Sequence, residues 1–342
     1  MMSTWSRIER SARSFSAMVL RRRQLLQLAG AGTASALFGQ ASAADTYPSR
    51  PIRWIVPFPA GGTTDLVARL LGQWLSQRLG QQVIVENKPG GGTNVGVQAA
   101  VAAPADGYTL LLMLSTNTIN PSLYKKLPFD FQHDIAPVAG LAELPLILEV
   151  NPSLPIKTLA DLLAYAKANP GKLNIASFGA RTISDLAIEL LQLSAGINVV
   201  RVPYPGGAPM LIDLVGGRVQ GAVDALPASL PHVRAGEIRA LALMSAKRSP
   251  ALPNVPTVGE TLPGFEANGW TGVGVPRGTP APIIERLNRE INAGLADPVI
   301  KARLAEVGGT PLIYTAGELA ALVARETRRW ADLIKRAGIQ PQ

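Results

Sequence analysis

Short apolar segments alternate with amphipathic segments from residue 52 onward, and this alternation constrains the fold more than any other feature of the chain. Residues 52–57, 83–86 and 109–114 have the apolar composition of buried strands. Residues 64–79 and 94–102, which lie between them, place apolar side chains on one face of a helix. This order of elements predicts a mainly parallel sheet that is covered by helices.

The same alternation returns between residues 146 and 244. Strands are expected over residues 146–150, 173–176, 199–202, 219–224 and 238–244, and helices over residues 159–167, 184–194 and 210–215. A short strand then ends at Val275, and helices are expected over residues 282–295, 299–307 and 316–337. Two α/β units and a returning tail predict two lobes, because chain ends often lie close together. We place them at residues 45–143 plus 269–342 and at residues 144–268.

Residues 1–43 have the features of a removable export signal. Three arginines at residues 21–23 are followed by Gln-Leu-Leu, which fits the twin-arginine pattern of two arginines, any residue and two apolar residues. A weakly apolar stretch over residues 25–38 leads to Ala-Ser-Ala at residues 41–43, a typical cleavage site. The stretch is too short to span a hydrocarbon core of about 30 Å, so cleavage is expected rather than anchoring.

The net charge of +9 first suggests a nucleic-acid partner. Residues 1–43 hold six arginines and one glutamate, so only about +4 remains for the rest of the chain. The remaining basic residues are scattered, and nucleic acid is therefore not an expected partner, whereas an anionic ligand is. The chain has no cysteine and only two histidines, His133 and His232, so no metal and no cofactor is expected.

The loop at residues 57–65, Pro-Phe-Pro-Ala-Gly-Gly-Thr-Thr-Asp, joins the first strand to the first helix. Its two glycines allow a close approach of the backbone to a ligand. The first N–H groups of the helix are unpaired donors, which makes this loop a candidate anion site with Thr63 or Thr64 as the helix cap. It lacks the Gly-x4-Gly-Lys pattern of nucleotide loops. An ordinary tight turn is the alternative.

Other loops follow expected strands in the same way. Residues 177–182, Ser-Phe-Gly-Ala-Arg-Thr, repeat the arrangement in the second lobe, so the two loops are expected to face each other across a cleft. Residues 115–118 follow the third strand, and ligands of open α/β sheets bind beyond the carboxyl ends of strands. Tyr204 is a candidate to line one side of the ligand site, and Asp224 is a candidate to bind an amine, a hydroxyl or a water. The alternatives are a solvated turn for residues 115–118 and a local backbone brace for Asp224.

These loops contain the candidate ligand-binding residues, and no catalytic residues are assigned. The chain contains no Gly-x-Ser-x-Gly elbow, no His-Glu-x-x-His motif and no cysteine, so an enzyme is not expected, although a carboxylate-based hydrolase stays open. The candidates are Phe58, Ala60, Gly61, Gly62, Thr63, Asp65, Ser115, Asn117, Ser177, Gly179, Arg181, Thr182, Tyr204 and Asp224.

Motifs across nearly all of the chain after residue 43 carry a family resemblance. They include Val-Pro-Phe-Pro-Ala-Gly-Gly-Thr-Thr-Asp at residues 56–65, Val-Glu-Asn-Lys-Pro-Gly-Gly-Gly at 85–92, Asp-Gly-Tyr-Thr-Leu at 106–110, Val-Pro-Tyr at 202–204 and Asn-Val-Pro-Thr at 254–257. Together they resemble the receptors of tripartite tricarboxylate transporters, also called the Bug family.

The resemblance implies a two-lobed α/β periplasmic-binding-protein fold of the Venus-flytrap, type II-like kind. It implies a small carboxylate ligand held by the loops at residues 60–65 and 177–182, and a periplasmic location. The implied partner is the integral membrane permease of a tripartite tricarboxylate transporter. The alternatives are a secreted α/β enzyme that acts on carboxylates and a soluble ligand receptor for a membrane sensor kinase.

The chain departs from the family pattern in the second loop. The family usually has Gly-Asn-Gly-Thr, then two residues and a histidine, whereas this chain has Arg181 at the second glycine and Asp185 at the histidine. A guanidinium can pair bidentately with a carboxylate, so we expect Arg181 to select a ligand with a second anionic group. The alternative is an ion pair between Arg181 and Asp185 on one helical turn.

Replacing Arg22 and Arg23 together with lysine should leave the uncleaved precursor in the cytoplasm, because the twin-arginine route requires its arginine pair. Cell fractionation measures this, and lysine at Arg7 and Arg10 is the matched control. Mass spectrometry of the unaltered protein should find a mature N-terminus at Ala44. Normal periplasmic accumulation of the first double variant would contradict the twin-arginine route.

Overall fold

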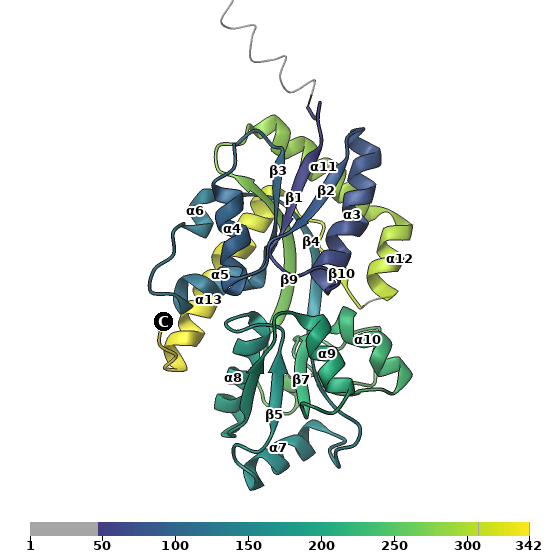
Figure 1. Cartoon of the computed structure of the whole chain (residues 1–342), viewed down its shortest axis with the longest axis vertical. Coiled ribbons are helices and arrows are strands. Elements are labelled where there is room, and N and C mark those ends of the chain that lie inside the picture. Colours follow the sequence, from purple (N-terminus) through teal and green to yellow (C-terminus); the bar gives the residue numbers. More distant parts are fainter. Residues whose placement is uncertain (1–46, 307, 342) are drawn as a thin grey trace, which may run out of the picture. The chain divides into compact units, whose positions relative to one another are not determined.

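The computed structural model describes residues 47–306 and 308–341 (Figure 1). The chain divides into a compact unit over Pro48–Gln342 and an N-terminal unit that ends at Tyr47. The signal expected over residues 1–43 lies outside the described residues. None of the helices that the structure describes is long and apolar enough to cross a membrane.

One mixed sheet runs through the larger unit in the strand order β2-β1-β3-β9-β4-β7-β5-β6. In its first half the central strand β1 (Ile52–Val56) pairs in parallel with β2 (Val83–Asn87) and with β3 (Thr109–Leu114). β9 (Asn268–Pro276) pairs antiparallel with β3. All six residues of β3 are buried, which explains its uninterrupted apolar sequence. The parallel order expected for the first three strands is confirmed.

Helices cover this first half of the sheet (Figure 1). Their bounds are α3 (Thr63–Leu79), α4 (Asn94–Val101), α5 (Ser115–Leu123), α6 (Phe131–Asp134), α11 (Ala281–Ala296), α12 (Pro298–Glu306) and α13 (Ala316–Arg336), with a 3₁₀ turn η1 at Gly91–Thr93. α13 packs against α5, and it also packs against the long strand β4 (Ile135–Val150). Both contacts join the C-terminal helix to elements of the first half of the sheet.

The second half of the sheet is built around β7 (Gly221–Ala225), which pairs antiparallel with β4 and parallel with β5 (Asn174–Ser177). β6 (Val200–Pro203) pairs with β5, β8 (Arg239–Leu243) pairs with β4, and β10 (Thr310–Pro311) pairs with β4 in the first half. The helices here are α7 (Leu159–Ala168), α8 (Ile183–Ala195), α9 (Gly207–Val215) and α10 (Leu226–Ala235), with a 3₁₀ turn η2 at Val258–Glu260.

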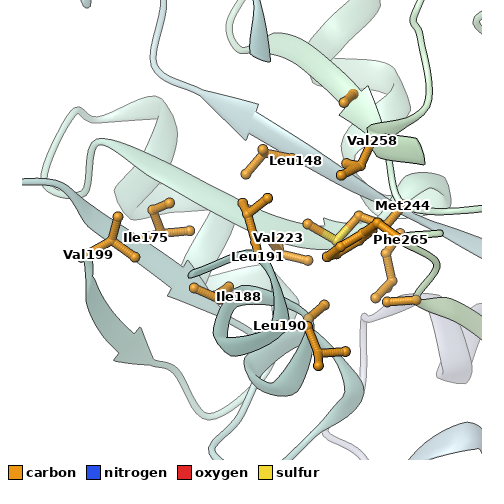
Figure 2. Close-up of a cluster of buried hydrophobic side chains, with 14 of the residues drawn as sticks. Leu148, Ile175, Ile188, Leu190, Leu191, Val199, Val223, Met244, Val258 and Phe265 are labelled. Atoms are coloured by element: carbon orange, nitrogen blue, oxygen red, sulfur yellow. The ribbon is translucent and has the colours of Figure 1, made fainter. Parts of the chain in front are cut away.

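An apolar core holds α8 against this half of the sheet. Figure 2 shows Ile188 and Leu191 of α8 beside strand residues that include Leu148, Ile175 and Val223. All five side chains are fully buried. Burying an aliphatic side chain of this size stabilises the fold by about 1.5–3 kcal/mol. The position of α8, and hence of the loop before it, is thus set by the core.

β4 belongs to both halves of the sheet, and its length was not expected. Its residues 135–145 pair with β9, whereas Leu146–Val150 pairs with β7. Only residues 146–150 were expected as a strand. Two prolines, Pro137 and Pro145, interrupt the local pattern, and the register with β9 shifts twice, so only the pairing itself defines this strand. The lobe boundaries at residues 143 and 144 stay a prediction.

The structure corrects two local expectations. Residues 115–118 are the first turn of α5 and not a loop, because the Asn117 side chain accepts a 2.8 Å hydrogen bond from the backbone N–H of Leu114 and so stabilises the helix start. Neither Thr63 nor Thr64 caps α3. The N-cap is Gly62, in an extended conformation and without a side-chain hydrogen bond.

Gly96→Ala should lower the free energy of unfolding by about 1–3 kcal/mol. A Cβ at Gly96 of α4 would stand 2.6 Å from the Cβ and 3.0 Å from the Cα of Pro57, at the end of β1. Urea denaturation measures the change. Gly72→Ala in α3 is the matched control, because its Cβ would meet Val83 at an ordinary 3.7 Å. It should stabilise by about 0.5–1 kcal/mol, and equal losses in both variants would contradict this packing.

Candidate ligand-binding site

A cavity of about 90 Å³ is lined by residues from the starts of α3, α5, α8, α9 and α10. The first N–H groups of a helix lack partners within the helix, and they carry the positive end of its dipole. The N-caps of α3, α8, α9 and α10 form no side-chain cap hydrogen bond. The arrangement therefore concentrates backbone donors around one small space, which suits an anionic group.

Hydrogen bonds to the carboxylate of Asp65 hold the first loop, residues 57–65, in place. Gly61 has a φ of +84°, and its N–H donates a 3.0 Å hydrogen bond to Asp65 Oδ2. Arg69 and Asn87 donate to the same carboxylate at 2.9 and 3.0 Å. Burial opposes ionisation of Asp65, but the hydrogen bonds from Arg69, Gly61 and Asn87 outweigh it and hold the pKa of Asp65 below its ordinary value. Asp65 therefore shapes the loop and does not line the cavity.

The carboxylate of Asp185 holds the second loop, residues 177–182, in the same way. Arg181 has a φ of +61°, and its backbone N–H donates a 3.0 Å hydrogen bond to Asp185 Oδ2, four residues on. Arg201 pairs with Asp185 at 3.2 Å, as Arg69 pairs with Asp65 in the first loop. A left-handed conformation costs a non-glycine residue about 1–2 kcal/mol. This backbone conformation explains why a glycine is usual at the position of Arg181 in the family pattern.

The side chain of Arg181 lies away from the small cavity. Its guanidinium is 4.7 Å from the ring centroid of Tyr124, and it lines an open groove of about 1000 Å³. The 3₁₀ turn η1 packs against the loop that contains Arg181. A Cβ built at Gly92 of this turn would stand 3.8 Å from the Cβ of Arg181. The pairing of Arg181 with a second anionic group of a ligand stays a prediction.

Two aromatic side chains join the two loops. The rings of Phe58 and Phe178 meet edge to face, with centroids 5.8 Å apart. Both residues line the cavity and the open groove, so the pair forms the wall between them. The expectation that the two loops lie opposite each other agrees with this contact.

The structure divides the candidate residues into three groups. The cavity is lined by Phe58, Ala60, Gly62, Thr63, Ser115 and Asp224. The open groove is lined by Gly179, Arg181, Thr182 and Tyr204, and also by Phe58. The residues outside both linings are Gly61, Asp65, Asn117 and Ser177.

Sequence reasoning missed several residues that line the cavity. Gly206 and Gly207 begin α9 directly after a strand, which is the signal that identified Gly61 and Gly62, so they could have been found. Leu144, Leu146 and Trp270 carry no such signal, because they enter the lining only through the pairing of β4 with β9 and with β7. No group of three or more potential metal-ligating side chains occurs in the described part of the chain.

Two buried carboxyl groups lie beside the cavity. Asp224 is 2% exposed and its Oδ1 accepts a 2.8 Å hydrogen bond from the N–H of Ala225, while Ser229 donates to Glu149 Oε1 at 2.9 Å. Asp224 Oδ2 and Glu149 Oε2 have no partner among the described residues. Burial raises the pKa of Asp224 to about 7. Burial and the nearby Asp224 raise the pKa of Glu149 well above its ordinary value.

Glu149→Gln should gain stability relative to the unaltered protein as the pH rises from 5 to 8. The native state keeps a proton on Glu149 that the unfolded chain, with a glutamate pKa of about 4.3, has released, so this group lowers stability as the pH rises toward its native pKa. Glutamine holds no such proton. Urea denaturation at both pH values measures the difference in unfolding free energy.

Glu260→Gln is the matched control for Glu149→Gln. Arg248 holds the pKa of Glu260 at about 2, so that carboxyl is ionised in both states throughout this range. Its stability difference from the unaltered protein should not change between pH 5 and pH 8. An equally flat difference for Glu149→Gln would show that Glu149 is ionised in the native protein.

The chain is similar to known receptors in sequence. Residues 67–339 match the model of the tripartite tricarboxylate transporter family receptor. The protein BugT of Bordetella pertussis is 40% identical over 318 residues, which are 92% of this chain and 98% of the relative.

Solved structures of carboxylate-bound proteins are similar to this chain in both sequence and fold. Rpa4515 of R. palustris with adipate is 38% identical, has a TM-score of 0.84, and is matched over 86% of this chain and all of that one. MatC of Rhodopseudomonas palustris with bound malate is 33% identical, with a TM-score of 0.79 over 84% of this chain and all of that one. The two-lobed α/β fold and the family resemblance are confirmed, and the chain belongs to the tripartite tricarboxylate transporter receptor family.

Proposed function

We propose that this chain is a periplasmic solute-binding protein that captures a small carboxylate in the 90 Å³ cavity between its two loops. One observation carries the proposal: helix starts from both halves of the sheet converge on that cavity. Backbone N–H groups at helix starts bind anions without a cationic side chain. The described lining residues include no arginine and no lysine, so the helix starts are the source of positive potential.

The ligands of related proteins support a carboxylate. Rpa4515 was solved with adipate and MatC with malate, and each is more than 30% identical to this chain. The candidate residues that line the cavity here, Gly62, Thr63 and Ser115 among them, offer backbone and hydroxyl donors to such a group. Adipate and malate are therefore suitable first probes.

A binding role is favoured over catalysis. Asp224 is the single ionisable side chain among the described residues that line the cavity, so the lining holds no nucleophile with a basic partner and no pair of carboxylates. The sequence motifs of common hydrolases are also missing. We infer delivery of the bound ligand to the integral membrane permease of a tripartite tricarboxylate transporter, after export through the signal at residues 1–43.

Gly62→Val should weaken binding of adipate or malate at least about tenfold, or about 1.4 kcal/mol, while the fold is retained. The added side chain projects at the N-cap of α3, where the backbone lines the cavity, and a Cβ there would meet nothing closer than the Pro59 carbonyl at 3.9 Å. Isothermal titration calorimetry measures affinity, and urea denaturation checks the fold.

Gly317→Val is the matched control for Gly62→Val. Gly317 lies exposed in the first turn of α13, a Cβ there would meet only Thr315 Oγ1 at 4.0 Å, and it lines neither the cavity nor the groove. It should bind both probes as the unaltered protein does. If Gly62→Val also binds both probes with unchanged affinity, the first loop is only a turn and the proposed site is wrong.

A further inference from the structure

Asp224 differs chemically from everything else around the cavity. It ends β7 and precedes α10, and it is the single ionisable side chain among the described residues of the lining. The remaining lining consists of apolar groups, the hydroxyls of residues such as Thr63 and Ser115, the indole of Trp270, and backbone at helix starts. An acid in a cavity built from anion donors needs a physical explanation.

The two oxygens of Asp224 have different surroundings. Oδ1 accepts the N–H of Ala225 and so stabilises the start of α10. Oδ2 has no partner among the described residues, although Asp224 is 2% exposed. Leaving a buried polar oxygen without a partner is unfavourable, because its hydrogen bonds to water are lost and not replaced. A ligand that supplies or shares a proton at this oxygen would remove that cost.

Burial raises the pKa of Asp224 and so favours its neutral form, while nearby groups on α10 oppose this effect. Ile147 is opposite Asp224 in the antiparallel pair of β4 and β7, so Glu149, two residues on, projects from the same face of the sheet. Glu149 is fully buried; its Oε1 accepts from Ser229, and its Oε2 has no partner among the described residues. On α10, Ser229 and His232 both lower the pKa of Asp224 without cancelling the effect of burial. His232 also pairs with Glu237 at 2.6 Å.

The start of α9 lies over the same carboxyl group. A Cβ built at Gly207 would stand 3.3 Å from Asp224 Oδ1 and 3.5 Å from Oδ2, so a side chain there would crowd the carboxyl group. α9 presents backbone there and no charged side chain, since Asp213 is engaged by Tyr204 and Arg218. The described ionisable groups that act on or with Asp224 are therefore Glu149 and His232, which pairs with Glu237, and α9 adds backbone dipoles.

We infer that Asp224 is a specificity-determining residue that binds a ligand carboxylate through one shared proton. Its neutral carboxyl O–H donates to a ligand carboxylate oxygen, and the helix starts hold the ligand charge. When Asp224 and the ligand are both ionised, binding takes one proton from solvent, and the two carboxyl groups that share this proton then carry one negative charge instead of two. The inference rests on the proposed function and deepens it.

This arrangement defines the ligands that the site prefers. An ionised Asp224 rejects a carboxylate that has no proton to offer, since two negative oxygens would face each other in a buried space. The pKa of Asp224 at about 7 means that small changes of pH near neutrality decide which form is present. A fully ionised dicarboxylate such as adipate should therefore bind with an affinity that depends on pH.

Calorimetric titration with adipate between pH 7 and pH 9 tests the inference. The dissociation constant should rise roughly 50-fold across this range, as expected for one group with a pKa of about 7 that must be protonated for binding. Titrations at pH 9 in buffers of different ionisation enthalpy should show uptake of about one proton per adipate bound.

Asp224→Asn separates the shared proton from a structural role. Asparagine keeps an oxygen for the Ala225 N–H and places an N–H₂ donor where the carboxyl O–H was. It should bind adipate with a dissociation constant that is the same at pH 7 and pH 9, without proton uptake. Asp332→Asn, on the exposed face of α13, is the matched control and should keep the pH dependence of the unaltered protein.

The outcomes distinguish the two proposals. Adipate binding that is independent of pH in the unaltered protein, or an Asp224→Asn variant that keeps the full pH dependence, overturns the role of Asp224 and leaves the proposed function standing. If adipate, malate and citrate all fail to bind at any pH between 6 and 9, both the proposed function and this inference are overturned.

Discussion

The pairing of β4 with strands on both of its sides is the constraint on which the rest of the structure depends. One end of β4 pairs with β9 in the first half of the sheet, and the other end pairs with β7 and β8 in the second. Because the strand is continuous, the carboxyl ends of strands from both halves face one region. The helices that follow those strands therefore begin around one cavity.

The same local device prepares both loops for a ligand. In each, a residue with positive φ donates its N–H to an aspartate four residues on, and an arginine holds that aspartate. The aspartate fixes the backbone without lining the cavity, and the N-cap residues of α3 and α8 form no side-chain cap hydrogen bond. Asp65 and Asp185 thus organise the loops, while the edge-to-face contact of Phe58 with Phe178 closes the wall between the cavity and the groove.

Electrostatics in the cavity come from backbone dipoles and not from cationic side chains. This gives the site a positive potential that does not titrate, in contrast to a site built from lysine or histidine. The one group that does titrate near neutrality is Asp224, which burial keeps close to its neutral form. In the proposed site, the backbone dipoles of the helix starts would therefore supply affinity for an anion. Asp224 would make binding depend on pH.

The amino-acid sequence alone determined the alternation of strands and helices and the two Gly-containing loops before α3 and α8, because hydrophobic period and glycine position are local properties. It also supported the family, through motifs spread along the chain. Gly62 and Thr63 became candidates because they lie in the loop between the first strand and the first helix.

Only the tertiary structure decided which residues share the cavity. The strand over residues 135–145, the burial of Glu149 behind Asp224, and the places of Leu144 and Trp270 in the lining depend on pairing between segments more than a hundred residues apart or on packing between strands. The stacking of Arg181 on Tyr124 likewise joins distant segments. No local pattern encodes such contacts, since their free energy arises only when both partners are already in place.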